Sequence, residues 1–212
     1  MAVIDLRIVG GHVALDLVNT VEPRTPEGTE FREHLNSPTD LMSWAVRLGI
    51  LTDTESEQVR AAWDASPTAG EQALRASLEI REATYDVLLT VLGTAPNPRP
   101  DAARALDHLG LRWAAATARS ALTFGGEALT LFVGTAPATL VPDRLAITTV
   151  EFLRTGDTNH VRACPLDEGG CGWFFLDRSR NGSRRWCAMG DCGVQAKSRR
   201  LTARRREARA AT

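Results

Sequence analysis

Four cysteines, all between residues 164 and 192, are the side chains of this sequence best suited to chemistry. They follow the spacing Cys164-x6-Cys171-x15-Cys187-x4-Cys192, which is two pairs joined by a longer connection. Zinc takes four thiolates in a tetrahedron, and two such pairs can close a site without a preformed core. Glycines adjoin Cys171 and Cys192, and small neighbours let backbone amides approach the sulfurs. We therefore predict one structural Zn²⁺ on these four residues, with no coordination position left open for water.

The x6 and x4 gaps are looser than the tight C-x2-C turn of many zinc sites, so the spacing leaves an alternative open. The cysteines could form two buried thiol pairs, or a redox or zinc sensor that switches by releasing its metal. A redox role needs an exposed thiol with a lowered pKa, which a sequence does not reveal.

Positive charge is concentrated beside the cysteines. Residues 178 to 212 contain eleven arginines and lysines but only Asp191 and Glu207 as acids, a formal charge of +9, whereas the preceding 177 residues carry −10. Such asymmetry indicates a polyanionic partner for the C-terminal part, most often nucleic acid.

Two segments supply the predicted nucleic-acid contacts. The loop 177–187 offers arginines for phosphates or guanine edges and small polar donors for phosphates. The stretch 194–210 has no Gly or Pro and predicts a helix with basic residues around it. A solvated basic tail is the simpler reading of such a helix, but its attachment to a cysteine cluster favours a binding surface. The predicted contact residues are Arg178, Ser179, Arg180, Asn181, Ser183, Arg184, Arg185, Lys197, Arg199, Arg200, Arg204 and Arg205.

The acidic body that precedes the cysteines predicts an α+β fold, mainly helical with small β-hairpins. Alternation of Val13, Leu15 and Leu17 predicts a hairpin or strand pair over residues 3–20. Helices are expected from Pro38 to Gly49, after a Thr52 capping box, along 74–92, around 106–116 and over 137–153, with a break at the proline-rich 96–100. A hairpin is expected over 121–133 around Gly125-Gly126. The run 173–176 and the last helix predict a small zinc-stabilised ββα-like module at the C-terminus.

No catalytic signature occurs in the body. It contains no P-loop, dinucleotide-binding glycine pattern, HExxH or nucleophile elbow, so we expect no enzyme activity. His12, Asp16, Asn19 and His34 could line a pocket but are more simply structural hydrogen-bonding groups. The aromatic residues Trp44, Trp63, Tyr85 and Trp113 lie in apolar stripes and are expected in the core. No apolar run approaches the roughly 18 residues of a membrane helix, so we expect a cytoplasmic protein.

The segment from Cys164 to Arg200, above all CGWFFLDRSRNGSRRWCAMGDCG, resembles the CGNR zinc-finger domain. The start GGHVALDLVNT, Gly10 to Thr20, resembles the opening of the ABATE domain that commonly precedes it. The resemblance implies a bacterial stress-associated transcriptional regulator with a ligand-sensing N-terminal domain and a DNA-binding finger. The resemblance implies that Cys164, Cys171, Cys187 and Cys192 are the metal ligands and that the family's basic loop corresponds to Ser179 through Arg185. The chain departs from the family at the signature itself, where Val194-Gln195 replaces Asn-Arg and leaves the contribution of that pair in question.

These observations lead to one hypothesis, a zinc-dependent regulator that binds double-stranded DNA. Residues 1–157 would form an ABATE-like domain for sensing a small-molecule effector or stress signal and for homodimerisation, and residues 160–212 a CGNR-type DNA-binding domain. An RNA-binding zinc module is the first alternative, because a basic finger can serve either nucleic acid. The redox or zinc sensor is the second.

Overall fold

The computed structural model describes residues 6–24, 31–93, 102–126, 128–155 and 157–210, and it divides into two compact units. Unit 1 contains Met1–Leu6 and His34–Thr158, and unit 2 contains Arg7–Glu33 and Asn159–Thr212. The chain passes from unit 1 to unit 2 between Thr158 and Asn159, and the sequence predicts a domain boundary between residues 157 and 160. The segment 7–33, however, is grouped with the cysteine-containing end of the chain rather than with the residues that follow it.

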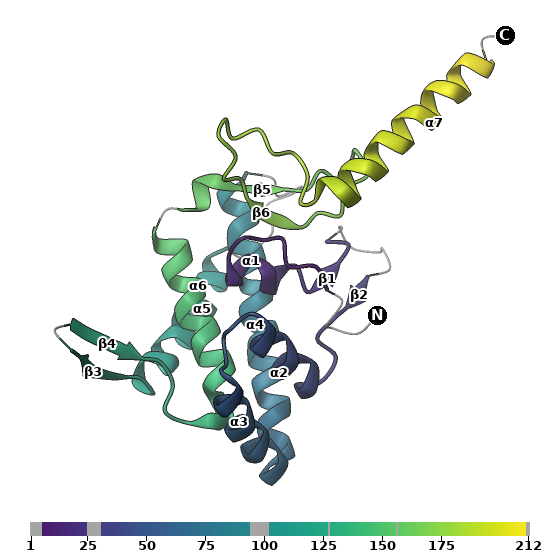
Figure 1. Ribbon diagram of the computed structural model, residues 1–212. Helices are drawn as coiled ribbons and strands as arrows, with labels where there is room; N and C mark the ends of the chain where they lie inside the picture. The colour runs from purple at the N-terminus through teal and green to yellow at the C-terminus, as the bar shows by residue number, and fades with distance from the viewer. Residues whose placement is uncertain (1–5, 25–30, 94–101, 127, 156, 211–212) are drawn as a thin grey trace. The chain divides into compact units, whose positions relative to one another are not determined.

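Unit 1 is built from helices and one hairpin, as expected (Figure 1). Among the described residues its elements are α2 (Pro38–Arg47), α3 (Asp53–Ala65), α4 (Pro67–Val91), α5 (Ala102–Ala118), β3 (Ala121–Gly125), β4 (Ala128–Phe132), the 3₁₀ turn η2 (Pro137–Thr139) and α6 (Leu140–Thr155). The predicted break at 96–100 lies outside the described residues. No helix in the described part of the chain is long and apolar enough to cross a membrane.

The starts of α2 and α3 show why the sequence predicts these helices well. The Ser37 hydroxyl accepts from the Asp40 N–H at 3.1 Å, with Pro38 at the first helical position. Thr52 and Glu55 form the predicted capping box, in which each side chain accepts from the other residue's backbone N–H. Both caps satisfy N–H groups that a helix cannot bond internally, so these boundaries are locally encoded.

Helix α4 packs against both α5 and α6 and forms the centre of unit 1. Trp44 and Ile80 are fully buried, and the Trp63 indole N–H donates to the Ala138 carbonyl at 3.0 Å. Tyr85 is also buried, so three of the four predicted core aromatics are confirmed. The prediction for Trp113 is wrong, because 41% of this residue is exposed. Its helical stripe faces partly outward, which periodicity alone could not reveal.

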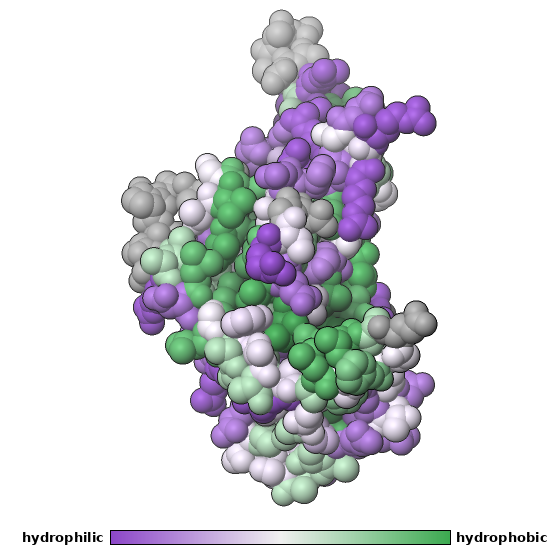
Figure 2. Space-filling view, turned by 90° about the vertical axis from the view of Figure 1, so that its left-hand side faces the viewer, coloured by the Kyte–Doolittle hydropathy of each residue, from purple (hydrophilic) through white to green (hydrophobic). Residues whose placement is uncertain are grey.

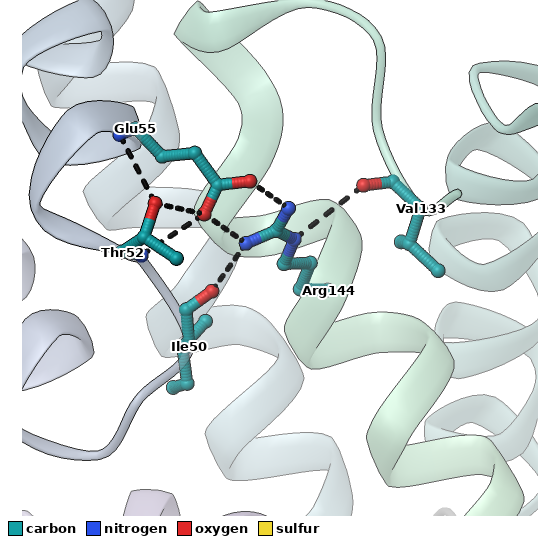
Figure 3. A network of polar contacts seen from close by, with 5 residues as sticks. All are labelled: Ile50, Thr52, Glu55, Val133 and Arg144. Carbon is teal, nitrogen blue, oxygen red and sulfur yellow. Dashed lines mark hydrogen bonds and ion pairs between the residues drawn. The ribbon is translucent and has the colours of Figure 1, made fainter. Parts of the chain in front are cut away.

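An ion-pair network fixes the start of α3 against α6 (Figure 3). The Arg144 guanidinium, from α6, donates to the Glu55 carboxylate through two nitrogens, one at 2.8 Å. It also donates to the backbone carbonyls of Ile50 and Val133. The hydrogen bond from Arg144 lowers the pKa of Glu55 to about 2. The capping residue of α3 therefore also anchors a distant helix.

Unit 2 contains α1 (Val13–Val18), β1 (Val21–Glu22), β2 (Arg32–Glu33), the 3₁₀ turn η3 (Asp157–His160) in part, β5 (Val161–Ala163), β6 (Phe174–Leu176), the π turn η4 (Met189–Gly193) and α7 (Val194–Ala210). β5 pairs antiparallel with β6 and α7 follows, so the predicted ββα-like module and the α+β class are confirmed. β1 and β2 form a second short antiparallel pair. Helix α7 projects from the unit (Figure 1).

The strand pair predicted over residues 3–20 is wrong, because residues 13–18 form helix α1. Five of its six residues are buried, including Ala14 and Asp16, so the apolar alternation does not mark one inward face. The His12 side chain caps the helix by accepting from the Ala14 N–H at 3.2 Å. A short helix buried on all sides has no diagnostic period, and this explains the error.

Candidate metal centre and nucleic-acid interface

The four cysteines form one buried cluster in unit 2. All four sulfurs lie within 4.8 Å of one another, and none of the cysteines is joined in a disulfide. The Sγ atoms of Cys171 and Cys187 are 3.5 Å apart, and those of Cys187 and Cys192 are 3.6 Å apart. The structure thus brings all four predicted ligands together from two separate loops.

This geometry fits a zinc ion. A tetrahedron with Zn–S bonds of about 2.3 Å has sulfur–sulfur edges of about 3.8 Å, close to the separations found here. A disulfide would require about 2.05 Å, far below them. Four sulfur ligands are the donor set of structural zinc sites, and they hold the surrounding loops together without offering a position for substrate. Cys164, Cys171, Cys187 and Cys192 are therefore the residues that would hold the metal.

The sulfurs also influence one another's protonation. Hydrogen bonding from Cys171 lowers the pKa of the Cys164 thiol, and the same contact raises the pKa of Cys171. The pKa of Cys187 is raised as well, first through its hydrogen bond with Cys164. Crowded buried thiols therefore resist sharing several negative charges when no cation is bound. Because zinc needs thiolates, metal binding must release protons.

The N-terminal segment of the chain lies directly against the cysteine loops. The Arg24 N–H donates to the Cys171 carbonyl at 2.9 Å, and the Trp173 indole N–H donates to the Val21 carbonyl at 2.7 Å. Gly172 has a φ of +76°, and a Cβ at this position would lie 2.2 Å from the Arg24 carbonyl oxygen. Glycine is required here both for its left-handed backbone and for this close approach. The segment next to Cys171 is thus shaped to receive residues 21–24.

Asn19 makes a second connection across the sequence. Its side chain donates to the Phe174 carbonyl at 2.8 Å and accepts from the Phe174 N–H at 2.9 Å. Both residues are almost completely buried. The amide therefore bonds to both backbone groups of a β6 residue, in the way that a neighbouring strand would.

Asp16 holds the turn that precedes α1. Its carboxylate accepts from the Val9 N–H at 3.1 Å and the Gly10 N–H at 2.8 Å. The Gly10 carbonyl in turn accepts from the Leu176 N–H at 2.8 Å, at the end of β6. A Cβ on Gly10 would lie within 3 Å of Leu15 and Asp16. The polar residues His12, Asp16 and Asn19 of the GGHVALDLVNT motif thus act as structural groups of unit 2. His34, which the sequence placed with them in a possible pocket, is grouped with unit 1.

Arg7 was missed by the sequence reasoning, because a single arginine before a turn carries no signal. Its guanidinium lies 4.7 Å from the centroid of the Trp173 ring and pairs with Asp191 at 2.8 Å and with Glu22 at 3.1 Å. Burial alone would lower the pKa of Arg7, but the hydrogen bond to Asp191 and the charge of Glu22 raise it overall. This cation therefore joins the N-terminal segment to the turn that contains Cys192.

The predicted nucleic-acid loop is organised by Asp177. Its buried carboxylate accepts from the Ser179 hydroxyl at 2.6 Å, the Ser179 N–H at 2.9 Å and the Arg184 N–H at 3.0 Å. These bonds, first that from the Ser179 hydroxyl, lower the pKa of Asp177. The Ser183 N–H donates to the Ser179 oxygen at 3.0 Å. The hydroxyl hydrogen of Ser179 is thus used within the loop, while Asn181 and Ser183 are exposed.

Arg184 occupies a different position from the other predicted arginines. Its guanidinium donates to the carbonyls of Leu176 at 3.4 Å, Trp186 at 3.0 Å and Cys187, and it lies 4.4 Å from the centroid of the Phe175 ring. Each of its nitrogens makes a bond inside the module. The observed geometry is that of a residue that holds the loop against the cysteine cluster.

The remaining predicted cations are exposed on the loop and on α7. Glu168 pairs with both Arg185 and Arg200, so one carboxylate joins the loop to the helix. The Arg199 side chain lies close to the position that a Cβ on Gly169 would occupy. The exposed basic residues among the predicted contacts, here called the basic surface, are Arg178, Arg180, Arg185, Lys197, Arg199, Arg200, Arg204 and Arg205. Unit 2 therefore presents eight predicted contact cations to solvent in the same unit as the metal centre.

Fold and site together define a zinc-finger protein, a small module built on four cysteines and attached to a mainly helical unit. The family described as "Putative stress-induced transcription regulator" matches residues 11–156, and the CGNR zinc finger matches residues 160–205. The chain belongs to this family of regulators, in the domain order that the sequence resemblance implied. No curated protein matches it. Residues 11–33 belong to the first match by sequence but to unit 2 by structure.

Proposed function

We propose that this chain is a transcriptional regulator that binds double-stranded DNA through unit 2. The observation that carries the proposal is the basic surface, which stands beside four clustered cysteines in a chain whose body is acidic. Arginine and lysine side chains that neutralise phosphates release counterions, and this supplies most of the sequence-independent affinity. The burial of all four sulfurs supports a structural metal rather than a redox switch, which needs an accessible thiol.

The arginines of unit 2 have two different roles, contact with DNA and support of the loop. Arg178, Arg180 and the α7 cations are exposed, so they can reach phosphates or base edges, and Arg200 would exchange its pairing with Glu168 for such a contact. Arg184 instead supports the loop from which they extend. Helix α7 has few apolar side chains, so its position depends on contacts such as the pairing of Arg200 with Glu168. DNA binding would add phosphate partners along its length.

The test is a fluorescence-anisotropy titration of the full zinc-loaded chain on a duplex from its own promoter and on a scrambled duplex, at two salt concentrations. We expect the promoter to be preferred at the higher salt and the preference to disappear when zinc is chelated. Equal, steeply salt-dependent binding to both duplexes, indifferent to the chelator, would overturn the proposal. Stronger competition by structured RNA than by duplex DNA would favour the RNA-binding alternative.

Three variants distinguish an arginine that contacts DNA from an arginine that supports the loop. Arg180→Ala should weaken binding with no change in zinc content, by about 1–3 kcal/mol if the residue reads a guanine. Arg60→Ala, an exposed arginine of unit 1, is the matched control and should bind as the unmodified chain does. Arg184→Ala should weaken zinc retention and DNA binding together, because the loop loses its internal donor. Wild-type zinc retention in Arg184→Ala would contradict this assignment.

The sensing part of the proposal rests on unit 1. A groove of 420 Å³ lies between α4 and α5, lined by the acids Glu79, Glu82 and Asp86 and by Arg75 and Arg104. This volume lies in the range of small-molecule sites, and the lining also includes the apolar Leu78, Ala83 and Ala105, which suits an effector with both apolar and polar parts. A compound that stabilises the chain in a thermal-shift screen should lose its effect when Leu78→Trp narrows the groove. Undiminished stabilisation would place the effector site elsewhere.

A further inference from the structure

The hairpin β3–β4 of unit 1 has one strongly apolar face. The strands pair antiparallel, with Leu122 opposite Leu131 and Phe124 opposite Leu129. Directly opposed residues lie on the same face of a hairpin, and alternate residues along a strand share a face. These four large side chains therefore lie together. The other face carries the pair Thr123 and Thr130 and smaller residues, with Phe132 at its end.

The apolar face is exposed to solvent. The exposed fractions of Leu122, Phe124, Leu129 and Leu131 are 68%, 84%, 63% and 44%. The hairpin projects from the helices of unit 1 (Figure 1), and Figure 2, which views that side, shows hydrophobic residues gathered there. An isolated two-stranded hairpin is marginally stable in water, so a hairpin with its larger side chains outward needs something to cover them.

The near absence of charge on the β3–β4 hairpin indicates what kind of partner covers its apolar face. Glu127 is the sole charged residue in 121–133, so the hairpin offers almost nothing to a nucleic acid or to a charged peptide. The four side chains expose about 500 Å² per copy, and a second copy would bring the buried total to about 1,000 Å², the size at which specific association begins. In a dimer with a two-fold axis, both copies contribute the same surface patch to the interface. An apolar patch suits this arrangement, because it brings no like charges together.

We propose that the apolar face of the β3–β4 hairpin is a homodimerisation surface and that its occupant is the same face of a second copy. Leu122, Phe124, Leu129 and Leu131 of one copy pack on those of the other. Burial of these side chains compensates for the hairpin's low stability alone. The inference does not depend on DNA binding, because its readout is the mass of the protein in solution.

The test is analytical ultracentrifugation of the full zinc-loaded chain over a dilution series. We expect a species of twice the 23.0 kDa chain mass at high concentration that dissociates on dilution. Phe124→Asp, which introduces a charge into the apolar face, should raise the dimer dissociation constant at least tenfold, about 1.4 kcal/mol. Thr123→Asp, on the opposite face of the same strand, is the matched control and should remain dimeric.

A monomer at every concentration of the unmodified chain would overturn the proposal. So would a Phe124→Asp variant that dimerises as tightly as Thr123→Asp. If Phe124→Asp fails to fold, hydrogen exchange on the unmodified chain decides the matter. Backbone amides of β3 and β4 should exchange more slowly at high than at low protein concentration, and concentration-independent exchange would contradict the proposal.

Discussion

Replacement of Asn19 by alanine should destabilise the zinc site although Asn19 is no ligand. The substitution removes two buried hydrogen bonds, of 2.8 and 2.9 Å, to the backbone of Phe174 in β6. Loss of a buried partner costs about 1–3 kcal/mol for each group, so we expect about 3 kcal/mol in total. Because folding and metal binding are coupled in such modules, this corresponds to about a hundredfold loss of zinc affinity.

Competition with a chromophoric zinc chelator measures this affinity directly, and thermal unfolding of the zinc-loaded chain measures the stability. Asn181→Ala is the matched control, because Asn181 lies in the same unit and is exposed. It should retain the wild-type zinc affinity. An Asn19→Ala chain that holds zinc and unfolds as the unmodified protein does would refute the structural role assigned to the N-terminal motif.

Three further outcomes follow from the contacts described above. Removal of zinc should accelerate hydrogen exchange in α1, β5 and β6 together, while α2 to α6 stay protected; independent behaviour of α1 would contradict the unit boundaries. Gly172→Ala should destabilise unit 2 by about 1–3 kcal/mol, because φ is +76° and the new Cβ would collide with the Arg24 carbonyl; an unchanged melting temperature would refute this. As pH falls from above 4.5 towards 2, protonation of Glu55 should remove the stability gained from its lowered pKa, about 1 kcal/mol after solvent screening. Glu55→Gln should flatten this part of the pH–stability profile, whereas the exposed Glu57→Gln should leave it unchanged.

Much of the fold could be predicted because its signals are local. Ser37-Pro38 and the Thr52 capping box mark helix starts with side chains that bond to the adjacent backbone. The Gly125-Gly126 turn likewise marks the hairpin over 121–133. The four cysteines were predicted as one metal site because zinc restricts ligand type and number.

The remainder depends on contacts that local sequence does not encode. Asn19 and Phe174 are 155 positions apart, and the sequence around either residue does not predict the contact between them. Helix α1 was missed because burial on all sides removes the amphipathic period. Arg180 and Arg184 lie in the same loop and each follows a serine, so only coordinates distinguish the arginine that supports the loop from the one that is exposed.

The grouping of residues 7–33 with residues 159–212 has a consequence for how the protein is made. The first segment leaves the ribosome well before β6 and the cysteines to which it bonds, so these contacts cannot form until late in synthesis. Residues 34–158, which lie between the two parts in sequence, can fold meanwhile as an inserted unit. Unit 2 can therefore be completed only after residues 159–212 have been synthesised. Until then Leu15, Leu17 and Val18, which are buried in the finished fold, lack the C-terminal part of their unit, and exposed apolar side chains of this kind promote aggregation.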